Sequence, residues 1–276
     1  MIESTESQAL AGLVDLEVYP IAALERADGK ALVKRLRRQL RADGLCVLPG
    51  FLTPTATRAL AQETEELAPV AYRGPTTTTV YYGKDAEGFP DGHPRRLRVP
   101  REMNEVAYDQ IPVESGLKRL YHSTLLPRFL AAVLGVGKLH RYADPYQAIT
   151  LSITGQGEGQ NWHFDDTDFI TTLLLQAPEQ GGEFECVPNL RSATDENYAG
   201  VLRVLEGARD AVKTVPFTEG SMMIFQGLYS LHQVAPVIGR RKRIVAVLSY
   251  DTRPGQVAPP GRNLELFGPR VMEADP

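Results

Sequence analysis

The sequence predicts a mainly β protein, in which a helical N-terminal part supports an antiparallel sandwich or barrel. Before about residue 144, apolar residues recur at the spacing of amphipathic helices in two stretches, 28–43 and 114–134. From Ala148 onward, short β-rich runs dominate, and turn-forming pairs such as Gly181-Gly182 separate several of them. Many short strands with regular turns favour an antiparallel arrangement over a parallel βαβ sheet. Because no linker-like stretch divides the chain, we expect one unit over 1–276, with a helical support and lid in 1–144, a β core in 145–253 and a tail in 254–276.

Two long helices are predicted in the N-terminal part. After a lead-in over residues 1–20 that we expect to fray, apolar residues on one face predict a helix from 28 to 43, ended by Gly44. Basic residues occupy its other faces; because they surround an apolar stripe, a solvated surface is favoured over an anion-binding one. A second helical pattern runs from 114 to 134 and ends at Gly135.

Between these helices the chain is predicted to form a strand, a third helix and a long loop. An apolar strand covers residues 45–48, and Thr53-Pro54 reads as the N-cap and first position of a helix that continues to about Leu67. The stretch from 69 to 112 has no clear periodicity. A loop of this length is typical of a lid or a binding loop, and a surface excursion is the alternative.

The β core is predicted from short runs rich in β-branched and aromatic residues. These runs lie at 149–153, 169–175, 183–187, 212–215, 221–225 and 244–250. Residues 197–207 are expected to form a helix or an irregular insert between strands. The region from 254 to 276 is rich in proline and glycine and is interpreted as a tail.

Composition excludes several classes of protein. With 276 residues, a net charge of −4 and a pI near 5.8, the chain has no general attraction to nucleic acid or to anionic membranes. The two cysteines, Cys46 and Cys186, form no CxxC pair, so a reducing, cytoplasmic setting is expected. The acidic N-terminus does not resemble a signal peptide, and its apolar residues are too interrupted to span a bilayer. The oligomeric state is left open, with a homodimer among the alternatives.

A metal site is predicted where His163 and Asp165 occur two residues apart in a segment that reads as extended. Side chains at i and i+2 of a strand point to the same side, whereas Asp166 would point to the other. A barrel can bring His232 across to this pair. Two imidazoles and one carboxylate form a triad that leaves metal positions open and suits non-haem Fe(II). Zinc is the competing metal, although closed zinc sites prefer four ligands rich in cysteine.

Two further features support a site inside the barrel. Arg243 heads the apolar run 244–250, and an unpaired guanidinium in a barrel is costly. An anionic cosubstrate would satisfy it through paired hydrogen bonds. Arg241 has the same parity and is the alternative. If the strand is straight, Thr171 shares the parity of Asp165, so its hydroxyl is a candidate to assist at the anion, with a core-facing threonine as the alternative. His93, His122 and His140 are expected to be structural or surface residues.

These motifs resemble those of Fe(II)/2-oxoglutarate-dependent oxygenases. The resemblance covers about residues 145–253 and implies the double-stranded β-helix, a jelly roll. The matching segments are His163-x-Asp165, Gly181-Gly182-Glu183-Phe184, Gly220-Ser221-Met222-Met223-Ile224-Phe225, and His232-Gln233-Val234-x-Pro236-Val237-x-Gly239 followed by Arg243.

Within this superfamily, the chain is similar to the carrier-independent amino-acid halogenases and their hydroxylase relatives. The similarity lies in 162–169, in Leu174-Leu175-Gln176 and in Gly182-Glu183-Phe184-Glu185-x-Val187-Pro188-Asn189-x-Arg191. The halogenases have glycine in place of Asp165, which frees an iron position for chloride. The carboxylate here therefore implies hydroxylation. A lysine-specific branch holds its substrate with polar and acidic side chains, but the matching positions are Val247 and Ser249, so a less basic substrate is expected.

The resemblance implies a role for each candidate residue. Fe(II) would be bound by His163, Asp165 and His232, and 2-oxoglutarate would pair with Arg243, assisted by Thr171. Dioxygen would be consumed, a C–H bond of a small amino acid hydroxylated, and succinate and CO2 released. Arg98 and Arg101 are candidates for binding the substrate carboxylate, with surface charges as the alternative. Asp166 is a candidate for binding the substrate ammonium group, with a turn or surface carboxylate as the alternative. Desaturation or cyclisation by the same iron chemistry is an alternative, as is a non-catalytic barrel that binds a small molecule.

Overall fold

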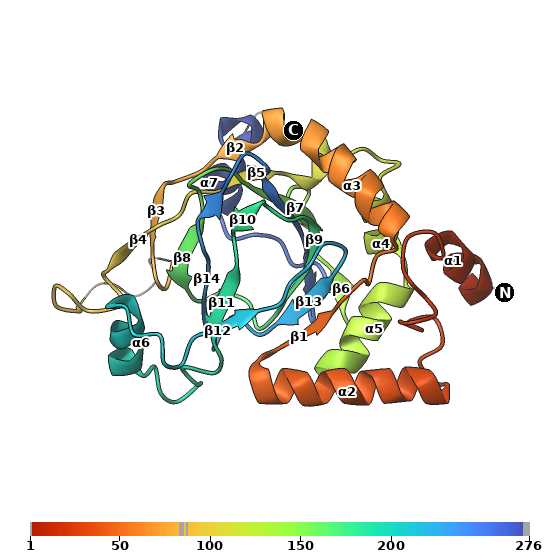
Figure 1. Ribbon diagram of the computed structural model, residues 1–276, viewed down its shortest axis with the longest axis horizontal. Helices are drawn as coiled ribbons and strands as arrows, with labels where there is room; N and C mark the ends of the chain where they lie inside the picture. Colours follow the sequence, from red (N-terminus) through yellow and green to blue (C-terminus); the bar gives the residue numbers. More distant parts are fainter. Residues whose placement is uncertain (1, 83–85, 87, 273–276) are drawn as a thin grey trace.

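The computed structural model describes residues 2–82, 86 and 88–272, and its centre is a pair of facing antiparallel sheets (Figure 1). Within these residues, seven strands form the large sheet in the order β1 (Leu45–Leu48), β13 (Met222–Phe225), β9 (Ile170–Gln176), β16 (Arg243–Leu248), β7 (Ile149–Thr154), β5 (Asn104–Val106) and β2 (Tyr72–Arg73). The small sheet has, in the same described part, the order β12 (Lys213–Val215), β11 (Phe184–Val187), β14 (Leu231–Val234) and β8 (Gln160–His163). The predicted double-stranded β-helix is confirmed.

Short ribbons and helices complete the fold. The ribbons pair β10 (Gln180–Gly181) with β15 (Val237–Ile238), β6 (His140–Arg141) with β17 (Tyr250–Asp251), and β3 (Thr77–Thr79) with β4 (Arg98–Pro100). The α-helices are α1 (Ile2–Leu10), α2 (Ala27–Asp43), α3 (Pro54–Glu66), α4 (Gly116–His122), α5 (Leu125–Leu134), α6 (Tyr198–Leu205) and α7 (Arg262–Phe267). The 3-10 helices are η1 (Ala68–Val70), η2 (Tyr108–Gln110) and η3 (Pro269–Met272). None of the helices among the described residues combines the length and apolar character needed to cross a membrane.

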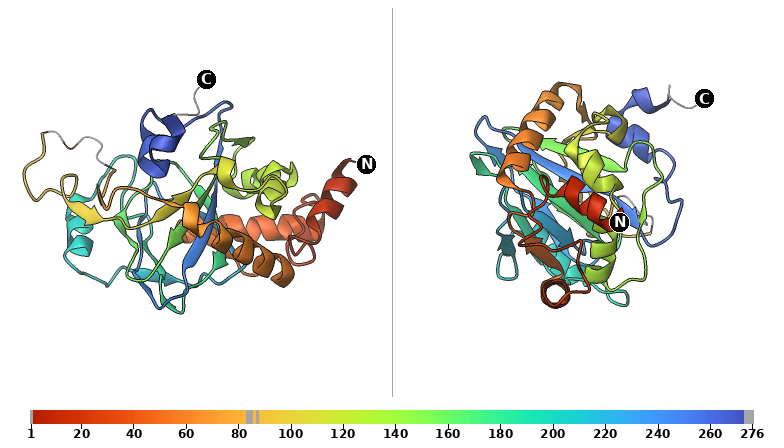
Figure 2. Two further views of the ribbon diagram at one scale, coloured as in Figure 1. Left: turned by 90° about the horizontal axis from the view of Figure 1, so that it is seen from above. Right: turned by 90° about the vertical axis from the view of Figure 1, so that its right-hand side faces the viewer.

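One face of the large sheet packs against the N-terminal helices. Figure 2 shows these helices gathered on one side of the strands. From β16, Ile244, Ala246 and Leu248 enter a large apolar core together with residues of α2, α4 and α5. Side chains alternate along a strand, so Arg243 and Val247 face the other way, toward the small sheet. The large sheet therefore separates a helix-facing core from the interior of the jelly roll.

A third layer covers the outer face of the small sheet. Trp162, Phe164 and Leu231 form an apolar cluster with residues of α6 and with Val80 and Tyr81, which follow β3. In Figure 1, α6 and the β3–β4 ribbon lie on the opposite side of the sheets from α2 and α5. Because the strands alternate, residues next to these outward-facing positions point into the jelly roll.

Local signals predicted the N-terminal elements well. Helix α2 ends at Gly44, whose φ of 66° is left-handed and whose N–H donates to the Leu40 carbonyl. Thr53 caps α3 by accepting a hydrogen bond from Ala56 N, and Pro54 is the first helical residue. The strand at 45–48 and the helix between β strands, α6, also form.

Three expectations were wrong. The predicted helix over 114–134 is divided, because Ser123 has an extended backbone and its hydroxyl accepts a hydrogen bond from Leu126 N in the first turn of α5. In the described part of 1–20, residues 2–10 form α1 in place of the expected fraying, and Leu10 and Val14 are buried in the core. The tail contains α7 and η3, anchored by the buried side chains of Leu266 and Phe267; its last four residues, 273–276, lie outside the described part.

The long stretch from 69 to 112 is partly regular. It contributes β2 and β5 to the large sheet and the β3–β4 ribbon to the outer layer. Residues 83–85 and 87 of this predicted lid lie outside the described part. The stretch therefore connects both sheets and does not simply loop over the surface.

Candidate metal centre

Three potential metal ligands converge at the edge of the small sheet. His163 is the last residue of β8, His232 lies opposite it on β14, and Asp165 lies in the loop after β8. Asp165 Oδ1 is 3.9 Å from His163 Nε2 and 3.5 Å from His232 Nε2. One ligand atom from each residue lies within 4.8 Å of the others, so a single metal ion can contact all three.

Backbone carbonyls orient both histidine rings. His163 Nδ1 lies 2.8 Å from the Asn161 carbonyl oxygen, and His232 Nδ1 lies 3.0 Å from that of Ser230. Because a carbonyl oxygen only accepts hydrogen bonds, each Nδ1 carries the hydrogen, and the Nε2 lone pairs are left for a metal. Burial, and then the neighbouring His232, lower the pKa of His163 to about 3, so its imidazole is neutral at physiological pH.

The Asp165 carboxylate occupies a tight space beside Gly227. Burial alone would raise the pKa of Asp165, but His232 and His163 hold it below its usual value. The Oδ2 atom is buried and has no hydrogen-bond partner in the described part of the chain. A Cβ atom at position 227 would lie only 1.6 Å from Oδ2. Glycine at 227 thus leaves room for the carboxylate, whose unpaired oxygen fits a metal ligand.

Asp165 and Asp166 diverge, but strand alternation is not the cause. Strand β8 ends at His163, and a backbone hydrogen bond from Asp165 N to the Gly227 carbonyl fixes the loop that follows. This loop carries Asp165 into the site, whereas Asp166 is exposed. The remaining histidines lie elsewhere: His93 stacks on Phe89, His122 bonds to a tyrosine hydroxyl and His140 is in β6.

Arg243 and Arg241 differ sharply in their surroundings. Arg241 is on the surface and forms an ion pair of 2.7 Å with Glu219. Arg243 is only 4% exposed, and its guanidinium has no hydrogen-bond or ion-pair partner among the described residues. Burial lowers the pKa of Arg243 to about 10, which leaves it charged at neutral pH. A buried, charged and unpaired guanidinium fits an anionic ligand in the interior of the jelly roll.

The expected threonine is not the one beside Arg243. Thr171 pairs with Leu248, and both belong to the helix-facing side of the large sheet. The loop after Asp165 interrupts the strand, so counting parity from Asp165 to Thr171 was wrong. Thr154 pairs directly with Arg243, and Thr172 pairs with Val247, which shares the Arg243 face. Both hydroxyls are buried and lack a hydrogen-bond partner within the described residues, so they also fit an anion.

The two arginines predicted to bind substrate occupy different environments. Arg98 is exposed, and its guanidinium donates to the Thr77 hydroxyl and carbonyl. Arg101 is 3% exposed and pairs with Glu105 at 2.6 Å. The Nε and one terminal nitrogen of Arg101 are buried without a hydrogen-bond partner in the part of the chain described. Only Arg101 therefore offers buried unpaired donors.

Tyr82 and Arg262 adjoin the metal site, although no sequence pattern pointed to them. The Tyr82 ring lies 5.5 Å from the His163 ring, centre to centre, and edge-on to it. Gln160 donates a hydrogen bond of 2.7 Å to the Tyr82 hydroxyl. The Arg262 guanidinium lies 5.1 Å from the centre of the Tyr82 ring. Arg262 opens α7, so the stretch interpreted as a tail contributes a cation beside the site.

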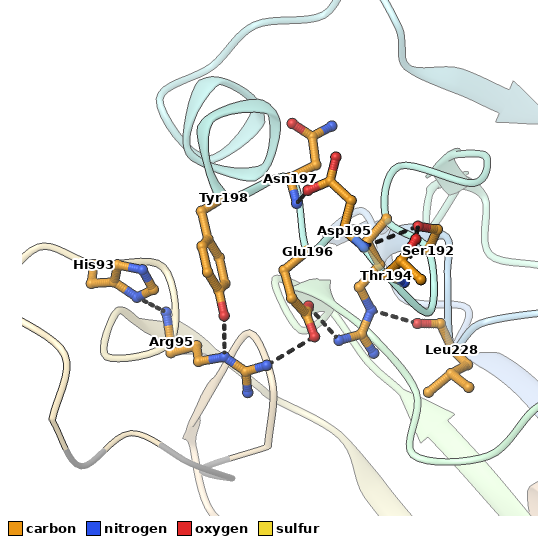
Figure 3. A network of polar contacts seen from close by, with 10 residues as sticks. His93, Arg95, Ser192, Thr194, Asp195, Glu196, Asn197, Tyr198 and Leu228 are labelled. Carbon is orange, nitrogen blue, oxygen red and sulfur yellow. Dashed lines mark hydrogen bonds and ion pairs between the residues drawn. The ribbon is translucent and has the colours of Figure 1, made fainter.

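A polar cluster in the outer layer holds the predicted lid region (Figure 3). Glu196 accepts from Arg95 at 3.0 Å and from Arg191 at 2.9 Å. Arg95 also donates to the hydroxyl of Tyr198 on α6, and Arg191 donates to the Leu228 carbonyl. Only Arg191 was singled out in the sequence, as part of a motif. This cluster joins the segment before β4 to the loop before α6.

Solved structures of low sequence identity share this fold. The carbocyclase SnoK from nogalamycin biosynthesis is 14% identical, with a TM-score of 0.56 over 88% of this chain and 91% of that one. The epimerase SnoN from the same biosynthesis is 16% identical, with a TM-score of 0.55 over 80% and 83%. An oxidoreductase of the 2OG-Fe(II) oxygenase family from Burkholderia pseudomallei is 16% identical, with a TM-score of 0.51 over 81% and 92%. None of the curated proteins compared matches the chain.

A jelly roll with a His–Asp–His triad and a buried unpaired arginine is the combination of features expected of an Fe(II)/2-oxoglutarate-dependent oxygenase. The model of one family, Halogenase D, matches residues 94–257, which is more than half of the chain. The protein therefore belongs to the halogenase D family.

Proposed function

We propose that the protein hydroxylates an unactivated C–H bond of a small free amino acid. The observation that carries this proposal is the Asp165 carboxylate, which lies 3.5 Å from His232 Nε2 where the resembling halogenases have glycine. With a carboxylate in that position, Asp165 would take the iron position that the halogenases free for chloride. His163, Asp165 and His232 would bind the iron, as their converging atoms allow.

The anion site would hold the cosubstrate. Arg243 offers a paired set of donors to the distal carboxylate of 2-oxoglutarate, and Thr154 and Thr172 offer hydroxyls on the same face. With iron bound, dioxygen would supply the oxidising power; one of its oxygen atoms would oxidise 2-oxoglutarate to succinate and CO2, and the other would enter the hydroxylated product. The protein positions the reactants and excludes water.

For the substrate, we propose that Arg101 binds the carboxylate. Its buried, unpaired N–H groups support this role, whereas Arg98 and Asp166 are exposed and would contribute from the rim. One buried core cluster contains residues from Leu10 to Tyr250, which supports a single oxygenase unit over 1–276. The cytoplasmic setting and the homodimer stay predictions.

A screen for succinate formation tests the proposal. The protein would be incubated with Fe(II), 2-oxoglutarate and a panel of amino acids, and the masses of the products would be measured by mass spectrometry. A gain of one oxygen supports hydroxylation, whereas a loss of two hydrogens indicates desaturation or cyclisation. Succinate formation that no amino acid stimulates would reject the substrate class, and no succinate at all would favour a non-catalytic barrel.

The variant Asp165→Gly tests the ligand assignment. It should bind iron more weakly and lose hydroxylation, with Asp168→Asn, at an exposed carboxylate nearby, as the matched control. If Asp165→Gly keeps full hydroxylation, the assignment is wrong.

A further inference from the structure

Tyr82 has a strained backbone. Its φ angle is 53°, in the left-handed region that a bulky residue rarely adopts. Its N–H closes a turn by donating to the Thr79 carbonyl at 3.0 Å. Strain of this kind persists only where the surroundings hold the residue, and such residues gather at functional sites. We therefore expect neighbouring residues to hold Tyr82 in this conformation, and the conformation to serve the site.

The strained turn directs two consecutive tyrosines to opposite sides of the small sheet. Tyr82 points inward, where its ring lies at 71° to the His163 ring and its hydroxyl accepts from Gln160. Tyr81 points outward into the apolar cluster under α6, where its ring lies 5.2 Å from that of Phe164. The Phe164 N–H donates to the Val80 carbonyl at 2.9 Å, so the turn is joined to the chain between two metal ligands.

Cations clamp Tyr81 from outside. The Arg95 guanidinium lies 4.5 Å from the centre of the Tyr81 ring, and that of Arg191 lies 4.2 Å from the centre of the Phe164 ring. Glu196 bridges the two arginines, as Figure 3 shows for its contact with Arg95. The Tyr81 hydroxyl is buried without a hydrogen-bond partner among the described residues, so rings and cations hold this side chain.

We propose that Tyr82 is a specificity-determining wall of the substrate site, and that Glu196 is a positioning residue that acts on it through Tyr81. The ring of Tyr82 limits the space beside His163 and presents an apolar surface to the aliphatic part of an amino-acid substrate. The Arg95–Glu196–Arg191 bridge, on the outer side of the small sheet, maintains the strained turn. This inference rests on the proposed function for the identity of the substrate, but the clamp can be tested without turnover.

The first experiment measures hydrogen exchange in the resting protein. In Glu196→Gln, which keeps the shape but removes the charge, the amides of residues 79–82 should exchange about tenfold faster than in the parent, because two charge-assisted bonds are weakened. Asp210→Asn is the matched control, because Asp210 pairs with Arg203 at 3.1 Å on the exposed side of the same region. Tyr81→Phe should exchange like the parent, since its hydroxyl has no partner. Unchanged exchange in Glu196→Gln would overturn the proposal that the Arg95–Glu196–Arg191 bridge maintains the turn.

The second experiment uses variants of Tyr82 to separate its role as a wall of the substrate site from the role of Glu196 in positioning it. Tyr82→Gly removes both the ring and the strain, whereas Tyr82→Ala removes only the ring, so the glycine variant should have the higher melting temperature. Both should accept bulkier amino acids and release more succinate per molecule of product. In the Tyr82→Gly background, Glu196→Gln should cause no further loss of coupling between succinate and product, because the wall it positions is gone. Additive losses would contradict the proposal.

These outcomes are distinguishable from failure of the proposed function. If no amino acid is oxidised, the exchange and melting measurements still decide whether Glu196 holds the turn. If amino acids are hydroxylated but Tyr82 variants keep the parent's substrate range, the wall is rejected while the hydroxylase stands.

Discussion

The two faces of the large sheet are built from the same strands but differ in chemistry. On the helix-facing side, β16 presents Ile244, Ala246 and Leu248 to an apolar core. On the interior side, the same strand presents the buried Arg243, and its neighbours present Thr154 and Thr172, whose buried hydroxyls lack partners in the described part. Buried polar groups without partners destabilise a fold, so the helix-facing side must supply the stability that the interior side lacks. The comparison predicts that stability and ligand binding can be altered separately.

Replacement of Arg243 should have the largest effect on binding. Arg243→Met should weaken 2-oxoglutarate binding by about 2–5 kcal/mol, since a buried charge partner is lost. The melting temperature should stay the same or rise, because the variant no longer buries an unpaired charge. Titration calorimetry on the metal-loaded protein measures the affinity, and Arg241→Met, on the surface, is the control. Equal losses in the two variants would remove the distinction between them.

A replacement on the helix-facing side of the large sheet should lower stability and leave 2-oxoglutarate binding unchanged. Leu248→Ala should lower the free energy of unfolding by about 2–5 kcal/mol, because it leaves a cavity in the helix-facing core. The folded protein should bind 2-oxoglutarate as tightly as the parent. Denaturant unfolding and calorimetry together check both expectations. A large loss of affinity would mean that the two faces are coupled.

The metal centre should depend on a glycine outside both faces. Gly227→Ala would place a methyl group 1.6 Å from Asp165 Oδ2, so the carboxylate must move. We expect metal affinity to fall by about 10- to 100-fold, the range seen when the support of a metal ligand is lost. Competition with a metal chelator measures it, and Gly137→Ala, at a glycine with no close neighbours and no positive φ, is the control for general damage. Unaltered metal affinity would show that the carboxylate does not need this space.

The finest test compares two adjacent threonines. Thr172→Val should weaken 2-oxoglutarate binding by about 1 kcal/mol through loss of one hydrogen bond, whereas Thr171→Val should leave it unchanged. Both variants should be at least as stable as the parent, because each removes a buried hydroxyl that lacks a partner among the described residues. Titration calorimetry on the two variants measures their affinities for 2-oxoglutarate. A larger effect at Thr171 would reverse the assignment of the faces.

Local chemistry accounts for the parts of the fold that could be predicted. Helix α2 needs only its apolar stripe and Gly44, and α3 needs only Thr53 and Pro54, since these signals act within a few residues. The break at Ser123 was missed because its apolar neighbours continue the helical spacing on both sides. The burial of the segment around Val14 was missed because its partner, Leu52, is distant in the chain.

The candidate site also has features that the local sequence predicts and features that depend on contacts between distant segments. The sequence alone was enough to select His163, Asp165, His232 and Arg243 as candidate site residues, because their residue types and spacing match one kind of chemistry. Only the tertiary structure decided that a loop carries Asp165 to the histidines, that Thr172 and not Thr171 shares the Arg243 face, and that α7 and Tyr82 adjoin the site. The physical reason is that strand alternation holds only while a strand continues. Once a loop intervenes, packing between distant segments sets where a side chain points.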